Sequence, residues 1–199
     1  MKKLILLLIL LFFCVSATLP KQAILLAGQS NMAKSANNII ALMPDYRIIN
    51  CSVGATSITT WQKGEVQYDN CLALVKRFQA DGYIIKGIFW YQGEQDTKER
   101  IIASQWKSLF YAFVNDFRTD IGVRAPVIFA QLGAMPVMGR EYWANVKYQQ
   151  RISASDNRQL YMITTSDIHP YCPTLAVHFC EDGYKIIASR FVDRFEEIR

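Results

Sequence analysis

The amino-acid sequence predicts an α/β protein with a doubly wound parallel sheet. Five short runs are continuously apolar rather than alternating, which is typical of strands buried on both faces. Segments with apolar side chains at steps of three and four lie between these runs, and that spacing is typical of helices. Strands that alternate with helices favour parallel pairing through crossover connections.

The expected strands are residues 22–27, 46–51, 83–90, 125–132 and 159–165. Besides a helix that begins near Ser30, the expected helices are 70–80, 98–118, 140–154 and 181–198. The two longest of these carry aromatic stripes, and we expect both stripes to pack in the core rather than to bind a cofactor.

Length and composition favour one globular domain. The chain has 199 residues, of which 51% are hydrophobic and 13% aromatic, so it can bury a sizeable core and is not of the disordered class. A net charge of +5, scattered along the sequence, is too small to indicate nucleic-acid binding.

The N-terminus has the pattern of a secretory signal peptide. Lys2 and Lys3 precede an apolar run that ends in small residues at Val15 and Ala17. We therefore expect residues 1–17 to be removed and 18–199 to form a single secreted or periplasmic domain, with no membrane attachment after cleavage. The alternative is an uncleaved anchor, although the run is shorter than the roughly 20 residues that span a bilayer.

Export changes the interpretation of the cysteines. Four remain after cleavage, and an even number in an oxidising compartment predicts two disulfides. Of the three connectivities, we favour Cys51–Cys71 and Cys172–Cys180. The alternative is a zinc site at His169, Cys172, His178 and Cys180, but their spacing is not typical of zinc ligands, and we expect no metal.

Polar residues follow the expected strands at the edge where doubly wound sheets bind ligands. Ser30 follows the first strand, and Gly54 follows the second. Gln92, Glu94 and Asp96 follow the third. Both histidines of the chain, His169 and His178, follow the fifth.

These residues contain the groups that acyl transfer requires. Ser30 could attack an ester carbonyl, a histidine could take its proton, and the N–H groups of Ser30 and Gly54 with the Gln92 amide could bind the oxyanion. Taken alone, Ser30 could equally be a helix cap. The stretch "GQSNM" also lacks the second glycine of the G-x-S-x-G elbow.

Four blocks together resemble the SGNH-hydrolase superfamily: "GQSNM", "SVGATSITTW", "WYQGEQDT" and "VHFCEDGY". Within it, the chain is similar to the sialate O-acetylesterase and acetyl xylan esterase group of carbohydrate esterases. The resemblance implies a three-layer α/β/α sandwich with about five parallel strands, and no metal or cofactor. It makes Ser30 the nucleophile, His178 the base, and Gly54 and Gln92 oxyanion donors.

One position departs from that family. An Asp often stands three residues before the catalytic histidine, and Leu175 occupies this place. Our first choice for the acid that orients His178 is Glu94, the second is Asp167, and the third is a Ser–His dyad without an acid. We expect Asp96 to be a helix N-cap, since Glu99 follows it at capping-box spacing.

The predicted function is a secreted serine esterase that removes O-acetyl groups from carbohydrate through an acyl-enzyme, acting as a monomer. Acetylated xylan, sialic acid, peptidoglycan and other glycans remain open as substrates. A glycosidase with Glu94 and Asp96 as its carboxylate pair is one alternative. A catalytically impaired carbohydrate-binding relative is another.

Overall fold

A five-stranded parallel sheet forms the centre of the protein. The computed structural model describes residues 20–134, 140–168 and 177–199. Its strands are β1 (Lys21–Gly28), β2 (Arg47–Asn50), β3 (Tyr83–Tyr91), β4 (Val127–Ala130) and β5 (Leu160–Ile163). They lie in the order β2-β1-β3-β4-β5, and every neighbouring pair is parallel. The predicted parallel sheet is confirmed.

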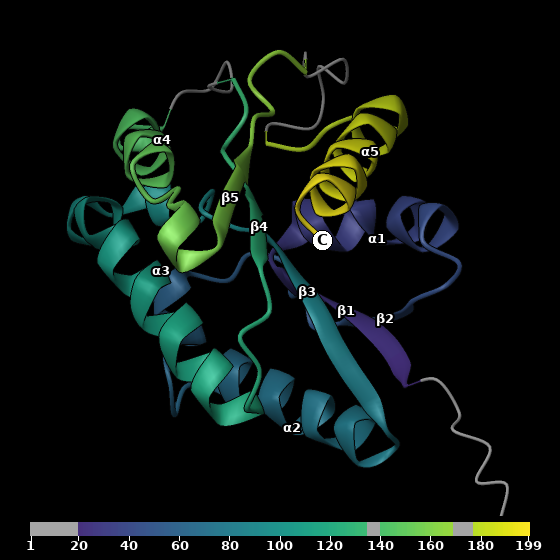
Figure 1. Cartoon of the computed structure of the whole chain (residues 1–199). Helices are drawn as coiled ribbons and strands as arrows, with labels where there is room; N and C mark the ends of the chain where they lie inside the picture. The colour runs from purple at the N-terminus through teal and green to yellow at the C-terminus, as the bar shows by residue number, and fades with distance from the viewer. Residues whose placement is uncertain (1–19, 135–139, 169–176) are drawn as a thin grey trace, which may run out of the picture.

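Helices cover both faces of this sheet, which gives three layers (Figure 1). The helices α1 (Ser30–Leu42) and α5 (Glu181–Ile198) pack together on one face. On the other lie α2 (Val66–Ala80), α3 (Arg100–Ile121) and α4 (Trp143–Arg151). Three short 3-10 helices, Ile58–Trp61, Asp96–Lys98 and Asp156–Arg158, lie in the connections. The predicted α/β/α sandwich is therefore confirmed.

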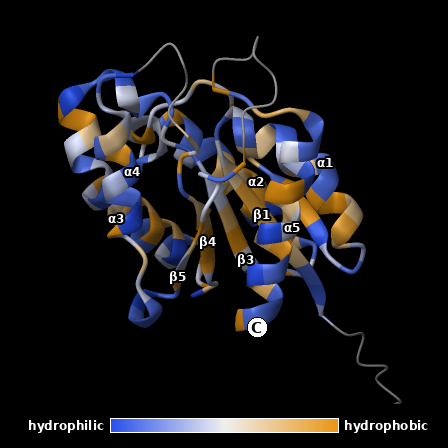
Figure 2. Ribbon diagram, turned by 90° about the horizontal axis from the view of Figure 1, so that it is seen from above, coloured by the Kyte–Doolittle hydropathy of each residue, from blue (hydrophilic) through white to orange (hydrophobic). Residues whose placement is uncertain are grey.

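The core lies between the layers and is rich in aromatic side chains. Figure 2 shows hydrophobic residues along the central strands and both hydrophobic and hydrophilic residues along the surrounding helices. Trp61, Trp90 and Phe113 are fully buried and lie in edge-to-face or tilted contact. Contacts of this kind contribute about 0.5–1.5 kcal/mol each beyond the area they bury. Trp61 is therefore a core residue.

Glycine is required where β1 ends. Gly28 has φ +121°, and a Cβ atom there would lie 2.2 Å from the carbonyl oxygen of Tyr91 in β3. The next residue, Gln29, donates its N–H to that same carbonyl at 2.8 Å. Because a side chain at Gly28 would push the two strand ends apart, this glycine sets the point from which α1 starts.

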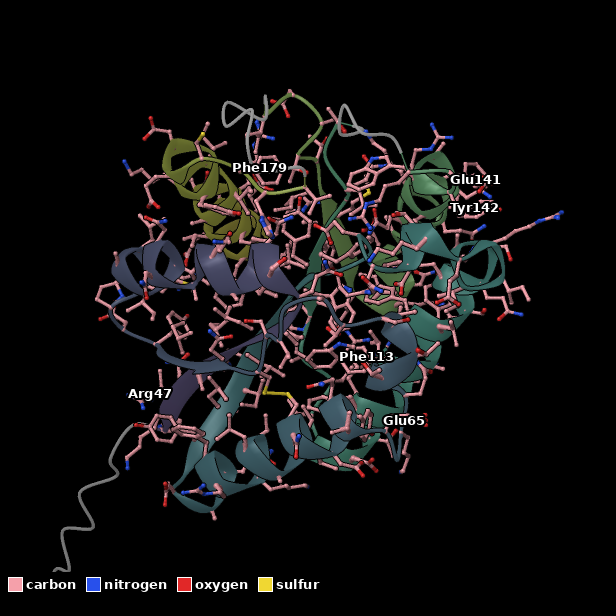
Figure 3. The ribbon with its side chains drawn as sticks, turned by 180° about the vertical axis from the view of Figure 1, so that it is seen from behind. Arg47, Glu65, Phe113, Glu141, Tyr142 and Phe179 are labelled. Carbon is pink, nitrogen blue, oxygen red and sulfur yellow. A yellow bond between two sulfur atoms is a disulfide. The ribbon has the colours of Figure 1, made fainter. Side chains whose placement is uncertain are left out.

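A disulfide joins Cys51, just after β2, to Cys71 in α2, with 5.4 Å between the Cα atoms. Figure 3 shows it as the yellow bond between the sheet and α2. The predicted Cys51–Cys71 pair is confirmed, and a bridge of this kind typically stabilises by about 2–4 kcal/mol. Cys172 lies outside the described residues, so the Cys172–Cys180 pair stays a prediction.

The predicted signal peptide, residues 1–17, also lies outside the described part. Within residues 20–134, 140–168 and 177–199, no helix is both long and apolar enough to cross a membrane.

Candidate active site

Ser30 occupies the first turn of α1, directly after the buried strand β1. The N-cap residue is Gln29, and no side chain caps this helix. The Ser30 hydroxyl instead lies 2.9 Å from Nε2 of His178. The alternative of Ser30 as a helix cap is therefore wrong, and the two residues that the sequence paired for acyl transfer lie within hydrogen-bond distance.

His178 belongs to a short connection that leads into α5. Partial burial lowers the pKa of its imidazole below the ordinary value of 6.5, and the nearby positive charge of Lys34 lowers that pKa further. The ring is therefore mostly neutral near pH 7, which is the form that accepts a proton. His169, the other histidine, lies outside the described residues.

Ser30 and His178 line a cavity of about 340 Å³ at the carboxyl edge of the sheet. Gly54, Ala55, Glu94, Lys98 and Arg140 line it as well. Phe179, labelled in Figure 3, lies at this end of the molecule. The cavity is thus lined by residues that follow β1, β2 and β3 and by residues of the connection before α5. This is the place expected for a site beyond the strand ends.

Two backbone N–H groups in this cavity are free to bind a ligand. A Cβ atom at Gly54 would lie 3.7 Å from Cβ of Ser30, so the two residues are neighbours. Within the described part of the chain, neither the Ser30 N–H nor the Gly54 N–H has a hydrogen-bond acceptor. Ala55 follows with φ +59°, a left-handed conformation that costs a non-glycine residue about 1–2 kcal/mol.

Gln92 lies behind the cavity rather than in it. Its amide nitrogen donates to the Thr56 carbonyl at 3.2 Å and to Asp96 Oδ2 at 2.6 Å, so both hydrogens have acceptors. Its amide oxygen accepts from the indole of Trp106 at 3.0 Å. The structure therefore gives Gln92 the geometry of a buried link between elements and does not bring its amide to Ser30.

The expected cap at Asp96 is wrong. Asp96 is buried, and its Oδ1 accepts the Ile58 N–H at 3.0 Å. The long helix α3 begins later, at Arg100, with Glu99 as its N-cap residue. Asp96 therefore ties the connection after β3 to the segment after β2, because buried N–H groups there need an acceptor.

Glu94 is a buried carboxyl at the side of the cavity, and burial raises its pKa to about 7. One carboxyl oxygen accepts a hydrogen bond from the Asn31 amide. The other is buried without a hydrogen-bond partner. Among the described residues no hydrogen bond joins Glu94 to His178, so the first-choice acid lies near the histidine without contacting it in this way.

Asp167, the second-choice acid, is bound elsewhere. Both of its carboxylate oxygens accept hydrogen bonds from Arg190 of α5, at 2.7 and 2.6 Å. This ion pair lowers the pKa of Asp167 to about 2. Leu175 lies outside the described residues.

Sequence reasoning missed three polar residues of this site. Asn31 and Gln29 flank Ser30 and are 1% and 2% exposed. Tyr184 in α5 donates its hydroxyl hydrogen to the Asn31 amide oxygen at 3.0 Å. The signal that could have revealed Gln29 and Asn31 is the polar run "QSN" directly after a buried strand, where each polar group must find a partner.

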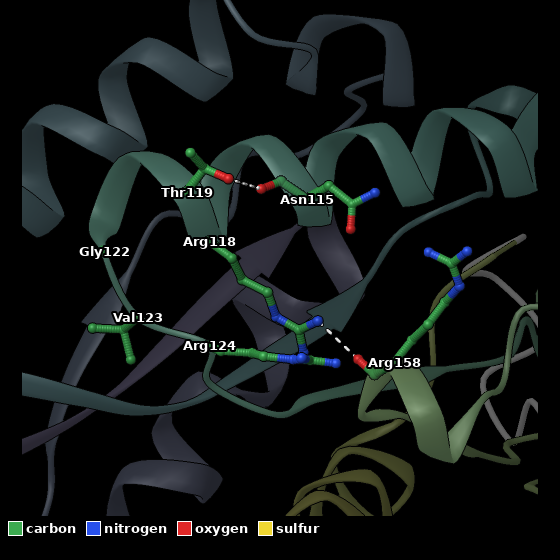
Figure 4. Close-up of a pocket in the computed structure, with 7 residues that line it drawn as sticks. All are labelled: Asn115, Arg118, Thr119, Gly122, Val123, Arg124 and Arg158. Carbon is green, nitrogen blue, oxygen red and sulfur yellow. Dashed lines mark hydrogen bonds between the residues drawn. The ribbon is translucent and has the colours of Figure 1, made fainter.

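A larger cavity, of about 580 Å³, lies at the opposite, amino-terminal edge of the sheet (Figure 4). Arg118, Arg124 and Arg158 line it. Arg118 donates to the carbonyl oxygens of Ala125, Arg158 and Gln159, so it holds the start of β4 to that of β5. Burial lowers its pKa to about 10. The described residues also contain no cluster of three His, Cys, Asp or Glu side chains that could hold a metal ion.

A serine and a histidine paired within hydrogen-bond distance is an arrangement that recurs in serine hydrolases of unrelated folds. Residues 35–197 match the family model "Carbohydrate esterase, sialic acid-specific acetylesterase". The chain belongs to this family of carboxylic ester hydrolases, which confirms the resemblance found in the sequence. The match begins five residues after Ser30, so the pairing of Ser30 with His178 is an independent observation of the structure.

Known proteins of this kind are similar to the chain in sequence and fold. The probable carbohydrate esterase At4g34215 of Arabidopsis thaliana is 25% identical over 99 residues, which cover 49% of this chain and only 36% of that protein. Its solved structure superposes with a TM-score of 0.78 at 15% identity, over 90% of this chain and 99% of the other.

Two bacterial carbohydrate acetylesterases share the fold. XAC1771 of Xanthomonas citri superposes with a TM-score of 0.64 at 15% identity, over 84% of this chain and 54% of that one. Est24 of Sinorhizobium meliloti gives 0.66 at 10% identity, over 90% and 100%.

The raised pKa of Glu94 predicts a pH-dependent stability. The native state keeps this proton up to about pH 7, whereas the unfolded chain releases it near 4.5. Wild type should therefore lose about 3 kcal/mol of unfolding free energy relative to Glu94→Gln between about pH 4 and about pH 8. Denaturant unfolding of both proteins at the two pH values measures this, and a difference that does not change with pH would contradict the burial of an ionisable Glu94.

Proposed function

We propose that this protein is a secreted serine esterase that hydrolyses O-acetyl esters of carbohydrates. The observation that carries the proposal is the 2.9 Å contact between Ser30 Oγ and His178 Nε2 in a cavity at the carboxyl edge of the sheet. Family membership supports ester hydrolysis on carbohydrate. The Cys51–Cys71 disulfide supports an oxidising, extracytoplasmic location.

In the proposed mechanism, Ser30 Oγ attacks the acetyl carbonyl while His178 Nε2 accepts the hydroxyl proton. The oxyanion that forms would be bound by the N–H groups of Ser30 and Gly54, which have no other acceptor among the described residues. The amino end of α1 adds a favourable dipole. His178 then gives the proton to the sugar oxygen as its bond to the acetyl carbon breaks, so that the sugar leaves as an alcohol. The acetyl-Ser30 intermediate is hydrolysed by water that His178 activates.

The charges that line the cavity favour an acidic glycan. Lys98 and Arg140 line it, and Lys34 is close enough to lower the pKa of His178. The other charged side chain in the lining is Glu94, whose pKa of about 7 keeps much of it neutral near neutral pH. A sugar that carries a carboxylate, such as sialic acid, would therefore be attracted, while neutral xylan would gain nothing from these charges. Ser30 acts together with His178 in this proposal, and no observation favours a glycosidase, because Asp96 is buried and bonded to Gln92 and Ile58.

Substitution of the paired residues tests the mechanism. Ser30→Ala and His178→Ala should each lower kcat for 4-nitrophenyl acetate by about 10³-fold or more, because neither residue can act without the other. Ser35→Ala is the matched control, since Ser35 is a buried serine farther along α1 whose hydroxyl bonds only to a backbone carbonyl. Equal activity of Ser30→Ala and the control would contradict a serine mechanism.

Leaving-group charge tests the substrate class. The ratio of kcat/KM for 4-acetoxybenzoate to that for the neutral 4-acetoxybenzamide should exceed one by about 3- to 10-fold at low salt and fall as salt screens the cavity charges. Lys98→Gln should reduce this ratio without changing the rate for the neutral ester. A ratio that neither salt nor Lys98→Gln alters would exclude charge-based selection.

A further inference from the structure

His178 lacks a group that orients its ring within the described part of the chain. Its Nε2 contacts Ser30, but no described side chain forms a hydrogen bond with its Nδ1. The residue also lies outside the helices and strands, three positions before α5. A general base must nevertheless be held in place, because a displacement of about 1 Å can cost about 10²-fold in rate.

The peptide groups on both sides of His178 are held by two buried side chains. The Asn31 amide donates to the carbonyl oxygen of Val177 at 3.0 Å. The Tyr184 hydroxyl accepts the N–H of Phe179 at 3.2 Å. Asn31 is 1% exposed and Tyr184 is 4% exposed. The backbone is therefore fixed immediately before and immediately after the histidine.

These two side chains are also bonded to each other in a consistent direction. The single hydrogen of the Tyr184 hydroxyl goes to Asn31 Oδ1 at 3.0 Å, so the hydroxyl oxygen is free to accept from Phe179. Asn31 Nδ2 has two hydrogens, of which one goes to Val177 and the other to Glu94. Every donor thus has one acceptor, and such a network has a single low-energy arrangement.

From this geometry we propose that Asn31 and Tyr184 are positioning residues that hold His178 against Ser30. Asn31 follows Ser30 directly in α1, and its side chain donates to the carbonyl just before His178. It therefore links the helix that carries Ser30 to the backbone that carries His178. Glu94 takes part by fixing the orientation of the Asn31 amide. The sequence-based prediction that Glu94 orients His178 then holds in an indirect form, through Asn31 and the Val177 carbonyl. This inference rests on the proposed function.

Tyr184→Phe is the direct test, because it removes one hydroxyl and keeps the ring. We expect kcat for 4-nitrophenyl acetate to fall about 10- to 100-fold while KM changes less than about twofold, since the base is displaced but the cavity is unchanged. Tyr68→Phe is the matched control: this ring is also fully buried, and its hydroxyl bonds only to Asp120 at 2.6 Å, away from the site. The Tyr68→Phe protein should keep the kcat of wild type even if its melting temperature falls by as much as that of Tyr184→Phe.

A double-mutant cycle shows whether Tyr184 acts through the histidine. In a His178→Ala background, Tyr184→Phe should cause no further loss of activity, because no base remains to be positioned. An unchanged kcat in the single variant, or a further 10-fold loss in the His178→Ala background, would overturn the inference. If Tyr184→Phe does not fold, Asn31→Ser replaces it, because this change removes the contacts to Val177 and Glu94. It should lower kcat in the wild-type background and cause no further loss in the His178→Ala background.

The His178→Ala and Ser30→Ala proteins separate this inference from the proposed function. Wild-type activity in both would overturn the serine mechanism and the positioning role together. Loss of activity in both with an unaffected Tyr184→Phe protein would overturn the positioning role alone.

Discussion

Side-chain amides satisfy the backbone polar groups that the parallel sheet leaves unpaired at its buried carboxyl edge. Gln29 accepts the N–H groups of Gly93 and Gln95, each at 3.4 Å. Gln150 of α4 accepts the Leu132 N–H at 2.7 Å and donates to the Gln92 carbonyl at 2.9 Å. Since an unpaired buried N–H or carbonyl costs about as much as a lost hydrogen bond, these amides decide how the connections after β1, β3 and β4 can lie.

The positions of the residues in the candidate site depend on these hydrogen bonds at the carboxyl edge of the sheet. Gly28 allows the ends of β1 and β3 to approach, and this approach sets where α1 and Ser30 begin. Asn31 then reaches both the segment before His178 and the Glu94 carboxyl. Ser30 and His178, which are 148 residues apart in sequence, meet because the residues beside each of them belong to the same buried network.

The fold could be predicted from sequence because its strands and helices have local patterns. Continuous apolar runs predict the buried strands, and amphipathic spacing predicts the helices. The four parallel strand pairs follow from connection rules that these patterns already satisfy. The serine, the glycine and the histidine of the site were predictable from motifs and all line one cavity.

The direction of buried side chains was not predictable in the same way. Gln92 carries a donor that suits an oxyanion, yet the Thr56 carbonyl and the Asp96 carboxylate take both of its hydrogens. Asp96 has the spacing of a helix cap but accepts the Ile58 N–H instead. The acceptor that a buried donor bonds to depends on its neighbours in the folded structure. These neighbours cannot be predicted from the spacing of residues along the sequence.

We propose that Ser30, activated by His178, forms a covalent intermediate. Labelling with a fluorophosphonate, followed by peptide mass spectrometry, can detect this activation, because the reagent reacts with an activated serine at the position an acyl group would occupy. We predict a single adduct on Ser30 that forms far more slowly in His178→Ala. Esterase activity that survives full exposure to the reagent with Ser30 unmodified would contradict the account.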